Sequence, residues 1–366
     1  MSIDTGAAGR AVPPLDSDDW IGVSDDPDQL YEQSMRDGWG DGLPIVPSTP
    51  ERMSQFLAAV GDIVFDEERH MLPGGGEVTL ERLAANAIMA GCRAEYFPVL
   101  VLAVKCMLRK QFNLLSVQTT THPVAPLLVV HGPVAQDLGM NSGAGMFGPG
   151  NRANATIGRA VRLVLMNVGG AYPGARDKAT QGQPSKYSFC IAENTTESPW
   201  PPYCVDEFGA DTDASAVTVV AAENPQNVSE HVSTDAEGVL LTIADAATKL
   251  GSNHPYLMGA EVFVVLSPEH AQTVAGGGFS RKDVQMYLYE NARIELARLK
   301  LLNLWGLHVW PPWLAGQQRD TAMMPVVSAP EMFKVLVGGG SGKHSCVLPG
   351  FGVSNAVTAL LDTSAP

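Results

Sequence analysis

Charged residues are scarce in this chain, and positive charge is scarcer than negative charge. Only 17% of its 366 residues are charged, and 24 lysines and arginines stand against 39 aspartates and glutamates, for a formal net charge of −15. This balance argues against an interface with nucleic acid or with an anionic membrane, so neither is expected as a partner. A site for an anionic molecule must therefore be built locally, against the field of the whole chain.

Cysteines and long apolar runs are also few. The five cysteines are odd in number and irregularly spaced, which does not fit a disulfide framework. Apolar segments such as residues 99–104 are too short to cross a bilayer. Residues 16–28 are acidic, where a secretory signal would be basic and then apolar. We therefore expect a cytoplasmic protein.

Metal-binding spacings are missing as well. The histidines are scattered, and HxxxH, HExxH and CxxC do not occur. Such spacings bring ligands onto one metal ion. No metal site is therefore predicted, and the sequence leaves the identity of any cofactor unknown.

What the chain does contain is enough apolar residues, 45%, for a large core. Strands alternating with helices predict an α/β fold, with mixed sheets and flanking helices in two lobes. The expected organisation is a flexible tail over residues 1–25, a larger α/β domain over 26–225 and a smaller α/β domain over 235–366, separated by a polar stretch at 223–233. The expected helices cover 50–60, 79–90, 98–110, 155–168, 235–250, 268–275 and 281–299, and the expected strands cover 127–131, 187–192, 216–221, 261–266 and 333–337.

The most informative segment is residues 148–159, GPGNRANATIGR, where a glycine-rich loop runs into the expected helix 155–168. Helix starts carry unpaired N–H groups and partial positive charge, and arginine binds carboxylate or phosphate with a two-pronged fork. The spacing matches neither a Rossmann nor a P-loop pattern, so no nucleotide is implied. A tight turn followed by a solvated basic face is the alternative. The candidate anion ligands are Asn151, Arg152, Asn154, Thr156 and Arg159.

Two cysteines are candidate nucleophiles. Cys92 lies between two expected helices, and Arg93 beside it favours a thiolate. Cys190 stands in an expected strand, and Glu193 follows just past the strand's end, so the pair is a plausible site rim. The alternative for Cys92 is a small buried side chain, since cysteine is among the most buried residues. Cys106 is expected in the core.

Histidine and polar loops supply further candidates. His122 ends a strand-like stretch beside hydroxyl groups, where it is placed for proton transfer, or simply hydrogen-bonded in a loop. His131, before Gly132, has the same two interpretations. The loop at residues 177–184 carries several polar side chains that could orient a substrate, or it is an ordinary surface loop. Its candidates are Lys178, Gln181 and Gln183.

A second glycine-rich loop, residues 338–345, ends in Lys343, His344 and Ser345. It is not a P-loop, because Val337 stands where that pattern needs glycine and a histidine follows the lysine. The tip could contribute to a site, with His344 moving protons and the other two side chains binding substrate. The alternative is a tight connection.

Long motifs of this chain resemble a largely uncharacterised bacterial family. They are DGWGDGLP (37–44), AIMAGCRAEYFP (87–98), TTHP (120–123), GPGNRANATIGRA (148–160), ATQGQP (179–184) and GKHS (342–345), and the resemblance extends from about residue 26 to the end. The family looks associated with small proteins carrying a Sec/Cys-Gly-Ser-Cys motif, which are similar to selenoprotein subunits of glycine and sarcosine reductases. The resemblance implies thiol or selenol attack on a carbon–heteroatom bond, with this chain holding the substrate. Because this chain lacks that motif, a redox pair would come from the partner protein.

The leading hypothesis is therefore an enzyme, or the large subunit of one, that cleaves a carbon–heteroatom bond in a small anionic substrate by elimination or reduction. A cysteine thiolate, Cys92 or Cys190, attacks, and His122, Glu193 or His344 moves protons. A hydrolase or hydratase of an amide or nitrile would use the same residue types. A third hypothesis is a non-catalytic substrate-binding subunit of a two-protein system.

A homo-oligomer is also expected. Trp305, Trp310 and Trp313 lie close together in the sequence beside Pro311 and Pro312. Exposed aromatic patches of this kind are often interfaces between subunits.

Overall fold

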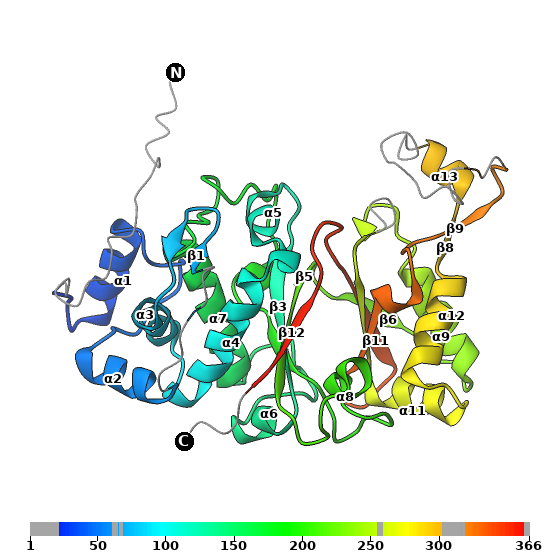
Figure 1. The fold of residues 1–366 in the computed structure, drawn as a ribbon, viewed down its shortest axis with the longest axis horizontal. Coiled ribbons are helices and arrows are strands. Elements are labelled where there is room, and N and C mark those ends of the chain that lie inside the picture. Colours follow the sequence, from blue (N-terminus) through cyan, green and yellow to red (C-terminus); the bar gives the residue numbers. More distant parts are fainter. Residues whose placement is uncertain are drawn as a thin grey trace.

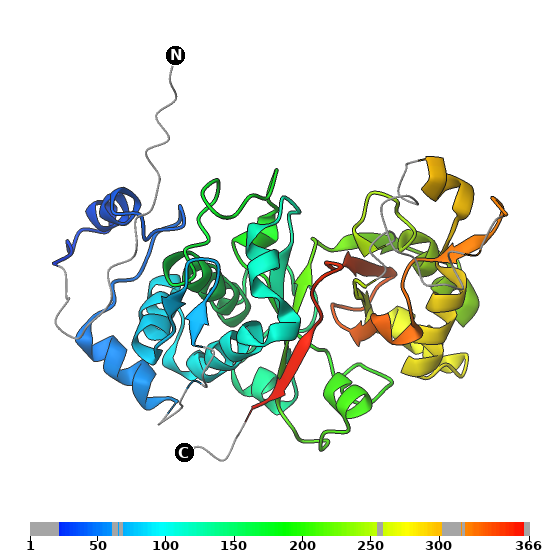
Figure 2. The ribbon, with the colours of Figure 1, turned by 45° about the horizontal axis from the view of Figure 1, so that its top comes forward.

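The structure is a computed structural model that describes residues 22–60, 65, 69–254, 259–301, 316 and 319–361. It is an α/β fold in which two four-stranded sheets lie at the centre and helices flank them on both sides (Figure 1). The turned view of Figure 2 keeps the strands between the same two groups of helices. The expected tail lies almost entirely outside the described residues, as do Trp305, Trp310 and Trp313, so the expected oligomer stays a prediction.

Most helices begin where the sequence places a cap. Thr49 accepts a hydrogen bond from the N–H of Arg52, and Thr79 from that of Arg82. Ser280 and Asp283 form a complete capping box. The α-helices are α1 Pro27–Arg36, α2 Pro50–Ala58, α3 Leu80–Ala90, α4 Phe97–Leu108, α5 Leu114–Thr119, α6 Pro133–Asp137, α7 Arg152–Asn167, α8 Tyr203–Phe208, α9 Ala236–Ala246, α11 Pro268–Gly276, α12 Arg281–Asn291 and α13 Leu296–Leu301.

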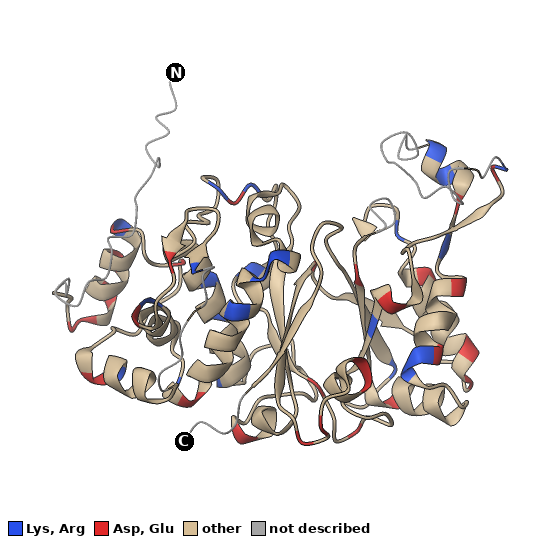
Figure 3. Ribbon diagram, viewed as in Figure 1, with Lys and Arg blue, Asp and Glu red and all other residues tan. Residues whose placement is uncertain are grey.

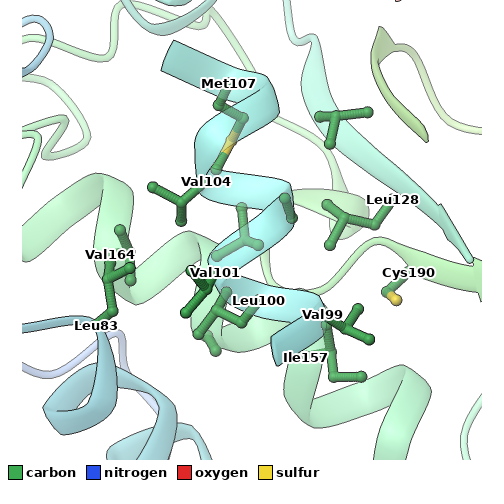
Figure 4. Packing of buried hydrophobic residues seen from close by; sticks show 14 of the residues in the cluster. Leu83, Val99, Leu100, Val101, Val104, Met107, Leu128, Ile157, Val164 and Cys190 are labelled. Atoms are coloured by element: carbon green, nitrogen blue, oxygen red, sulfur yellow. The ribbon is translucent and has the colours of Figure 1, made fainter. Parts of the chain in front are cut away.

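The first sheet has the strand order β12–β5–β3–β4. β3 (Ala125–His131) and β4 (Cys190–Ala192) are parallel, whereas β5 (Ala216–Ala222) and β12 (Val357–Leu360) pair antiparallel. Helix α4 lies between this sheet and helices α3 and α7, so it is apolar on nearly every side (Figure 4). Cys106 lies buried in this core, as expected.

The second sheet has the order β10–β7–β11–β6. β7 (Val262–Leu266) and β10 (Phe333–Val337) are parallel, and β11 (His344–Pro349) and β6 (Gln226–Ser229) pair antiparallel. Helices α9, α11 and α12 cover its outer face through one apolar cluster. A small hairpin, β1 (His70–Met71) with β2 (Gly76–Glu77), and an antiparallel pair, β8 (Arg293–Glu295) with β9 (Met323–Pro325), complete the strands of the described residues.

The two sheets repeat one pairing pattern and exchange their last strands. Each has a parallel pair, then an antiparallel strand, then an antiparallel edge strand. The strand that follows β5 in the chain, β6, joins the second sheet, and the strand that follows β11, β12, joins the first. The two crossing segments meet at a bridge between Ala222 and Gly350. This exchange interlocks the two halves of the chain.

A third apolar cluster joins the inner faces of the sheets. It contains Leu127 and Val129 of β3 together with Phe263 and Val265 of β7. Charged residues lie mostly on helices and loops, and the central strands are largely free of them (Figure 3). The α/β class is confirmed, but two separate lobes are not, because this cluster belongs to both sheets. The predicted division at residues 225 and 235 stays a prediction.

Two expectations about elements are wrong, and one stretch contains a strand that was not expected. The expected helix 281–299 is broken into α12, β8 and α13, because the chain turns at Ala292 to pair with β9. The polar stretch 223–233, which stays a predicted boundary, contains strand β6, which was not among the expected strands. Strand β10 is not the last, since β11 and β12 follow it. Strands β6, β8, β11 and β12 pair with partners distant in sequence, which a local pattern does not reveal.

Candidate functional site

The end of helix α3 positions Cys92. Gly91 adopts a left-handed conformation, with φ 91°, and its N–H donates to the carbonyl of Ile88. The N–H of Cys92 donates to the carbonyl of Ala87 at 3.0 Å, which completes a Schellman motif. Glycine is required here by the positive φ. The turn leaves the Cys92 side chain only 7% exposed.

The start of helix α7 is fixed to the same place. Arg152, its first residue, donates from Nε to the carbonyl oxygen of Gly91 at 3.0 Å. Asn151 caps the helix by accepting from the N–H of Asn154. Asn154 is buried, and its side-chain amide donates to the carbonyl of Asn141 and accepts from the same residue's N–H. The two asparagines thus hold the glycine-rich loop in shape.

A pocket of about 420 Å³ opens between these two helix ends. Three arginines, Arg52, Arg93 and Arg152, line it, and of the described lining residues one, Glu95, carries a carboxylate. Among the described residues, no carboxylate forms an ion pair with any of the three arginines. We call this the arginine pocket. Its other lining residues are Val46, Gln55, Phe56, Ile88, Gly91, Cys92 and Ala94.

Cys92 is a neutral thiol in this structure. Burial raises the pKa of the Cys92 thiol to about 12, although a hydrogen bond with Thr156 and the charges of Arg152 and Arg159 act in the opposite direction. The Thr156 hydroxyl itself donates to the carbonyl of Arg152 at 2.8 Å. The structure thus brings Cys92, Arg152 and Thr156 together, but desolvation outweighs the positive charge that was expected to favour a thiolate.

Arg159 is bound to Asp41 and is not left for a ligand. Its Nε and Nη2 donate to the two carboxylate oxygens of Asp41 at 2.7 and 2.8 Å, and Nη2 also reaches the carbonyl of Leu43. The two side chains are 13% and 2% exposed. This bidentate pair attaches the loop of residues 37–44 to helix α7.

Cys190 lies beneath the start of helix α7 and is buried. Cys190 packs closely against Gly158 of helix α7: a Cβ added at Gly158 would come within 3.2 Å of the Cys190 Cβ. Burial raises the pKa of the Cys190 thiol, and the nearby Cys92 raises it further. Cys190 is therefore close to Cys92 but is not among the residues that line the arginine pocket.

Glu193 belongs to a separate buried cluster. Its Oε2 lies 2.7 Å from Nδ1 of His131, at the carboxyl ends of strands β4 and β3. Nε2 of His131 contacts the Thr218 hydroxyl at 2.9 Å, and the Glu193 carboxylate accepts from the N–H of Tyr203. Arg281 lies 3.6 Å from Glu193 and also pairs with Asp206. Both partners of the His131–Glu193 pair are fully buried. Through Arg281, the cluster connects the first sheet to helix α12, which covers the second sheet.

His122 pairs with Glu223 outside the arginine pocket. Its Nε2 lies 2.9 Å from the Glu223 carboxylate, and its ring stacks on Phe351. Nearby, Gln183 donates to the carbonyl of Ala222 and accepts from the N–H of Asn224, which fixes a loop. The Lys178 ammonium donates to the carbonyl of Gly174, and the Gln181 side chain is exposed.

The second glycine-rich loop packs on the first. The N–H of Gly339 donates to the carbonyl of Ser142, and a Cβ at Gly340 would come within 2.8 Å of the Ala144 side chain. Beyond this contact, Lys343 donates to the carbonyl of His231, and Nε2 of His344 faces Nε2 of His231. Ser345 is buried and bonds to His270.

Of the residues that line this pocket, Cys92 and Arg152 were predicted site residues, whereas Arg52 and Glu95 were not. Arg52 lies in the first turns of α2 and Glu95 in the short 3-10 helix Ala94–Tyr96, and neither has a local motif of its own. The adjacent Arg93 was visible as the neighbour of Cys92. In the described part of the chain, no group of three or more His, Cys, Asp or Glu side chains is arranged to hold a metal ion.

Comparisons with protein-family models, curated proteins and solved structures find no match to this chain. The resemblance to a bacterial family therefore stays a prediction. All five cysteines lie within the described residues, and none forms a disulfide. Among the helices of the described residues, none is both long and apolar enough to cross a membrane.

Proposed function

We propose that this chain is an enzyme, or the large subunit of one, that binds a small anionic molecule in the arginine pocket and cleaves a carbon–heteroatom bond in it by elimination or reduction. One observation carries the proposal. Three arginines, none of them in an ion pair with a carboxylate of the described residues, line a pocket that also contains Cys92. In a chain with a net charge of −15, such a group of arginines provides a local site for an anion.

The arginines would bind and orient the substrate. Arg152 is held by its Nε on the carbonyl of Gly91, which leaves its two terminal nitrogens for a carboxylate or phosphate. Arg52 is likewise held, through Nη1 on the carbonyl of Pro47 at 2.6 Å. A guanidinium that is already fixed loses less conformational entropy when the ligand binds.

Cys92 and Glu95 would carry the chemistry. Because Cys92 holds its proton, attack by its sulfur needs a base, and Glu95 is the carboxylate in the same pocket. Glu95 takes the thiol proton, the sulfur bonds to the carbon, and the heteroatom leaves with the electron pair of the broken bond. For a reduction, a thiol or selenol of a second protein then attacks the Cys92 sulfur, and the carbon departs with a proton. The resulting mixed disulfide is reopened by another thiol.

Binding is tested with inorganic phosphate and succinate as probes. Arg93→Gln and Arg152→Gln are each expected to weaken binding at least tenfold, since a hydrogen bond to a charged group contributes about 1.5–3 kcal/mol. Arg298→Gln, at an exposed arginine on α13, is the matched control and should bind as the parent does. Equal affinity in all four proteins would exclude the arginine pocket as the anion site.

Catalysis is tested by product analysis. Small carboxylic acids that carry amino, hydroxyl or halogen groups are incubated with the protein and a dithiol, and products are identified by mass spectrometry. Loss of the heteroatom is expected with the parent and with the control Cys346→Ser, but not with Cys92→Ser. Activity that survives Cys92→Ser would refute the role of this thiol.

A second candidate is a substrate-binding subunit whose partner does the chemistry. It is favoured by the burial and the raised pKa of Cys92, which leave the thiol unreactive in the chain by itself. It predicts that Cys92→Ser binds the probes normally and supports full activity when a partner protein is added.

A further inference from the structure

Two histidines converge at the edge of the second sheet. Strands β11 and β6 pair antiparallel, with His344 opposite Ser229 and Cys346 opposite Asn227 (at the right in Figure 1). His344 and Asn227 are therefore diagonal neighbours on one face of the sheet. His231 follows two residues after the end of β6. The three side chains are exposed at this edge.

The geometry of the two rings is specific. Nε2 of His231 lies 3.2 Å from Nε2 of His344, and the rings are nearly perpendicular, at 79°, with centroids 4.8 Å apart. Nδ1 of His344 lies 3.0 Å from Oδ1 of Asn227. An amide oxygen only accepts hydrogen bonds, so Nδ1 of His344 carries the proton. The lone pair of a neutral His344 then lies on Nε2 and points toward His231.

We propose that His231 and His344 form a two-histidine site for a divalent first-row transition-metal ion, with Zn²⁺ as the reference cation. Zinc–nitrogen bonds of 2.0–2.1 Å in a tetrahedral arrangement place two ligand nitrogens about 3.3 Å apart, close to the spacing seen here. Asn227 supplies the hydrogen bond that typically orients a metal-binding histidine and sets its tautomer. Two coordination positions remain for water or for a donor atom of another molecule.

The surroundings permit a cation at this place. The Glu230 carboxylate accepts from the N–H groups of Val232 and Ser233, which holds it to the backbone. The Lys343 ammonium, a like charge, donates to the carbonyl of His231. The net charge of −15 attracts cations to the chain as a whole. None of these residues lines the arginine pocket, so the proposal for this site and the proposed function can be refuted separately.

A direct hydrogen bond between the rings is the competing account, with His231 donating from Nε2 to His344. It predicts no metal affinity beyond that of an isolated surface histidine. The two accounts therefore differ in a measurable quantity.

The experiment uses the full chain without an affinity tag, treated with EDTA and dialysed. Zn²⁺ is titrated in competition with a chromophoric chelator, and Co²⁺ binding is followed by visible absorption. We expect one Zn²⁺ per chain, a tetrahedral Co²⁺ spectrum, and affinity at least tenfold weaker in His231→Ala and His344→Gln. Asn227→Ala should weaken binding about tenfold. His70→Ala, at an exposed histidine on β1, is the matched control and should bind as the parent does.

Two results would overturn the proposal. One is a parent protein that takes up no Zn²⁺ in this titration. The other is uptake that persists at full strength in the His231→Ala, His344→Gln double variant. Circular dichroism of each variant checks that the fold is retained, and the measurement on the parent does not depend on any variant folding.

Discussion

The Cys92 thiol should be unreactive at neutral pH, in proportion to its raised pKa. With a pKa of about 12, the thiolate fraction at pH 7 is on the order of 10⁻⁵, against about 3% for an ordinary thiol of pKa 8.5. Ionisation alone then slows alkylation about 3,000-fold relative to an unfolded chain. Burial of the sulfur slows it further.

The assay is labelling with iodoacetamide between pH 7 and 10, read at each cysteine by peptide mass spectrometry. In the folded protein the rate at Cys92 should rise about tenfold per pH unit without a plateau, whereas in guanidinium chloride it should level off above about pH 9. Thr156→Val removes a hydrogen bond that lowers the Cys92 pKa, so its rate should fall below that of the parent. Labelling of folded Cys92 at pH 7 within tenfold of the denatured rate would refute the reasoning and restore the thiolate hypothesis.

Three further predictions concern stability, each measured by urea unfolding. Burial lowers the pKa of His254 from 6.5 to about 4, so the stability that its neutral form contributes is present above pH 6.5 and is lost as pH falls toward 4, by about 3 kcal/mol. In His254→Gln the free energy of unfolding should depend less on pH over this range. An unchanged pH dependence would contradict the assignment to His254. Arg159→Gln leaves the Asp41 carboxylate buried without its partner and should lower the free energy of unfolding by about 3 kcal/mol. Adding Asp41→Asn to this variant should restore part of the loss. A loss under about 0.5 kcal/mol would contradict a structural role for the Arg159–Asp41 pair. Gly158→Ala places a Cβ 2.6 Å from the Phe189 nitrogen and should lower the free energy of unfolding by about 1–3 kcal/mol. Gly139→Ser is the comparison, because φ there is 61° but nothing lies within 4 Å of an added Cβ, so this variant measures backbone strain without crowding. Equal losses in the two variants would contradict crowding at Gly158.

Local signals predicted most of the longer helices and most of the central strands. Thr49 followed by Pro50 begins a helix because the threonine hydroxyl accepts a hydrogen bond from a backbone N–H. Proline lacks an N–H, but the N–H of the first helical residue has no partner within the helix, so nothing is lost there. The α/β alternation was visible because each helix buries one face and each central strand is apolar.

Pairing between distant segments was not predictable in the same way. Strand β6 is short and mostly polar, and only its register with β11 makes it a strand. The exchange of β6 and β12 between the sheets depends on contacts across the whole chain, and no local pattern encodes it. The same limit applies to the site, where Cys92 and Arg152 were each identified but their meeting at Gly91 was not.

Which arginines form ion pairs explains why the composition could not locate the anion site. Arg159 and Arg162 lie on the same helix as Arg152, but each faces a buried carboxylate, Asp41 or Asp177. Asp41 and Asp177 lie far from each other in the sequence, on either side of these arginines, so the sequence alone did not distinguish a paired arginine from an unpaired one. Arg159 and Arg162 hold loops to helix α7 through these acidic partners, whereas Arg152 has no such partner among the described residues and lines the pocket. The local excess of positive charge beside Cys92 is therefore a product of the fold, in a chain that is acidic overall.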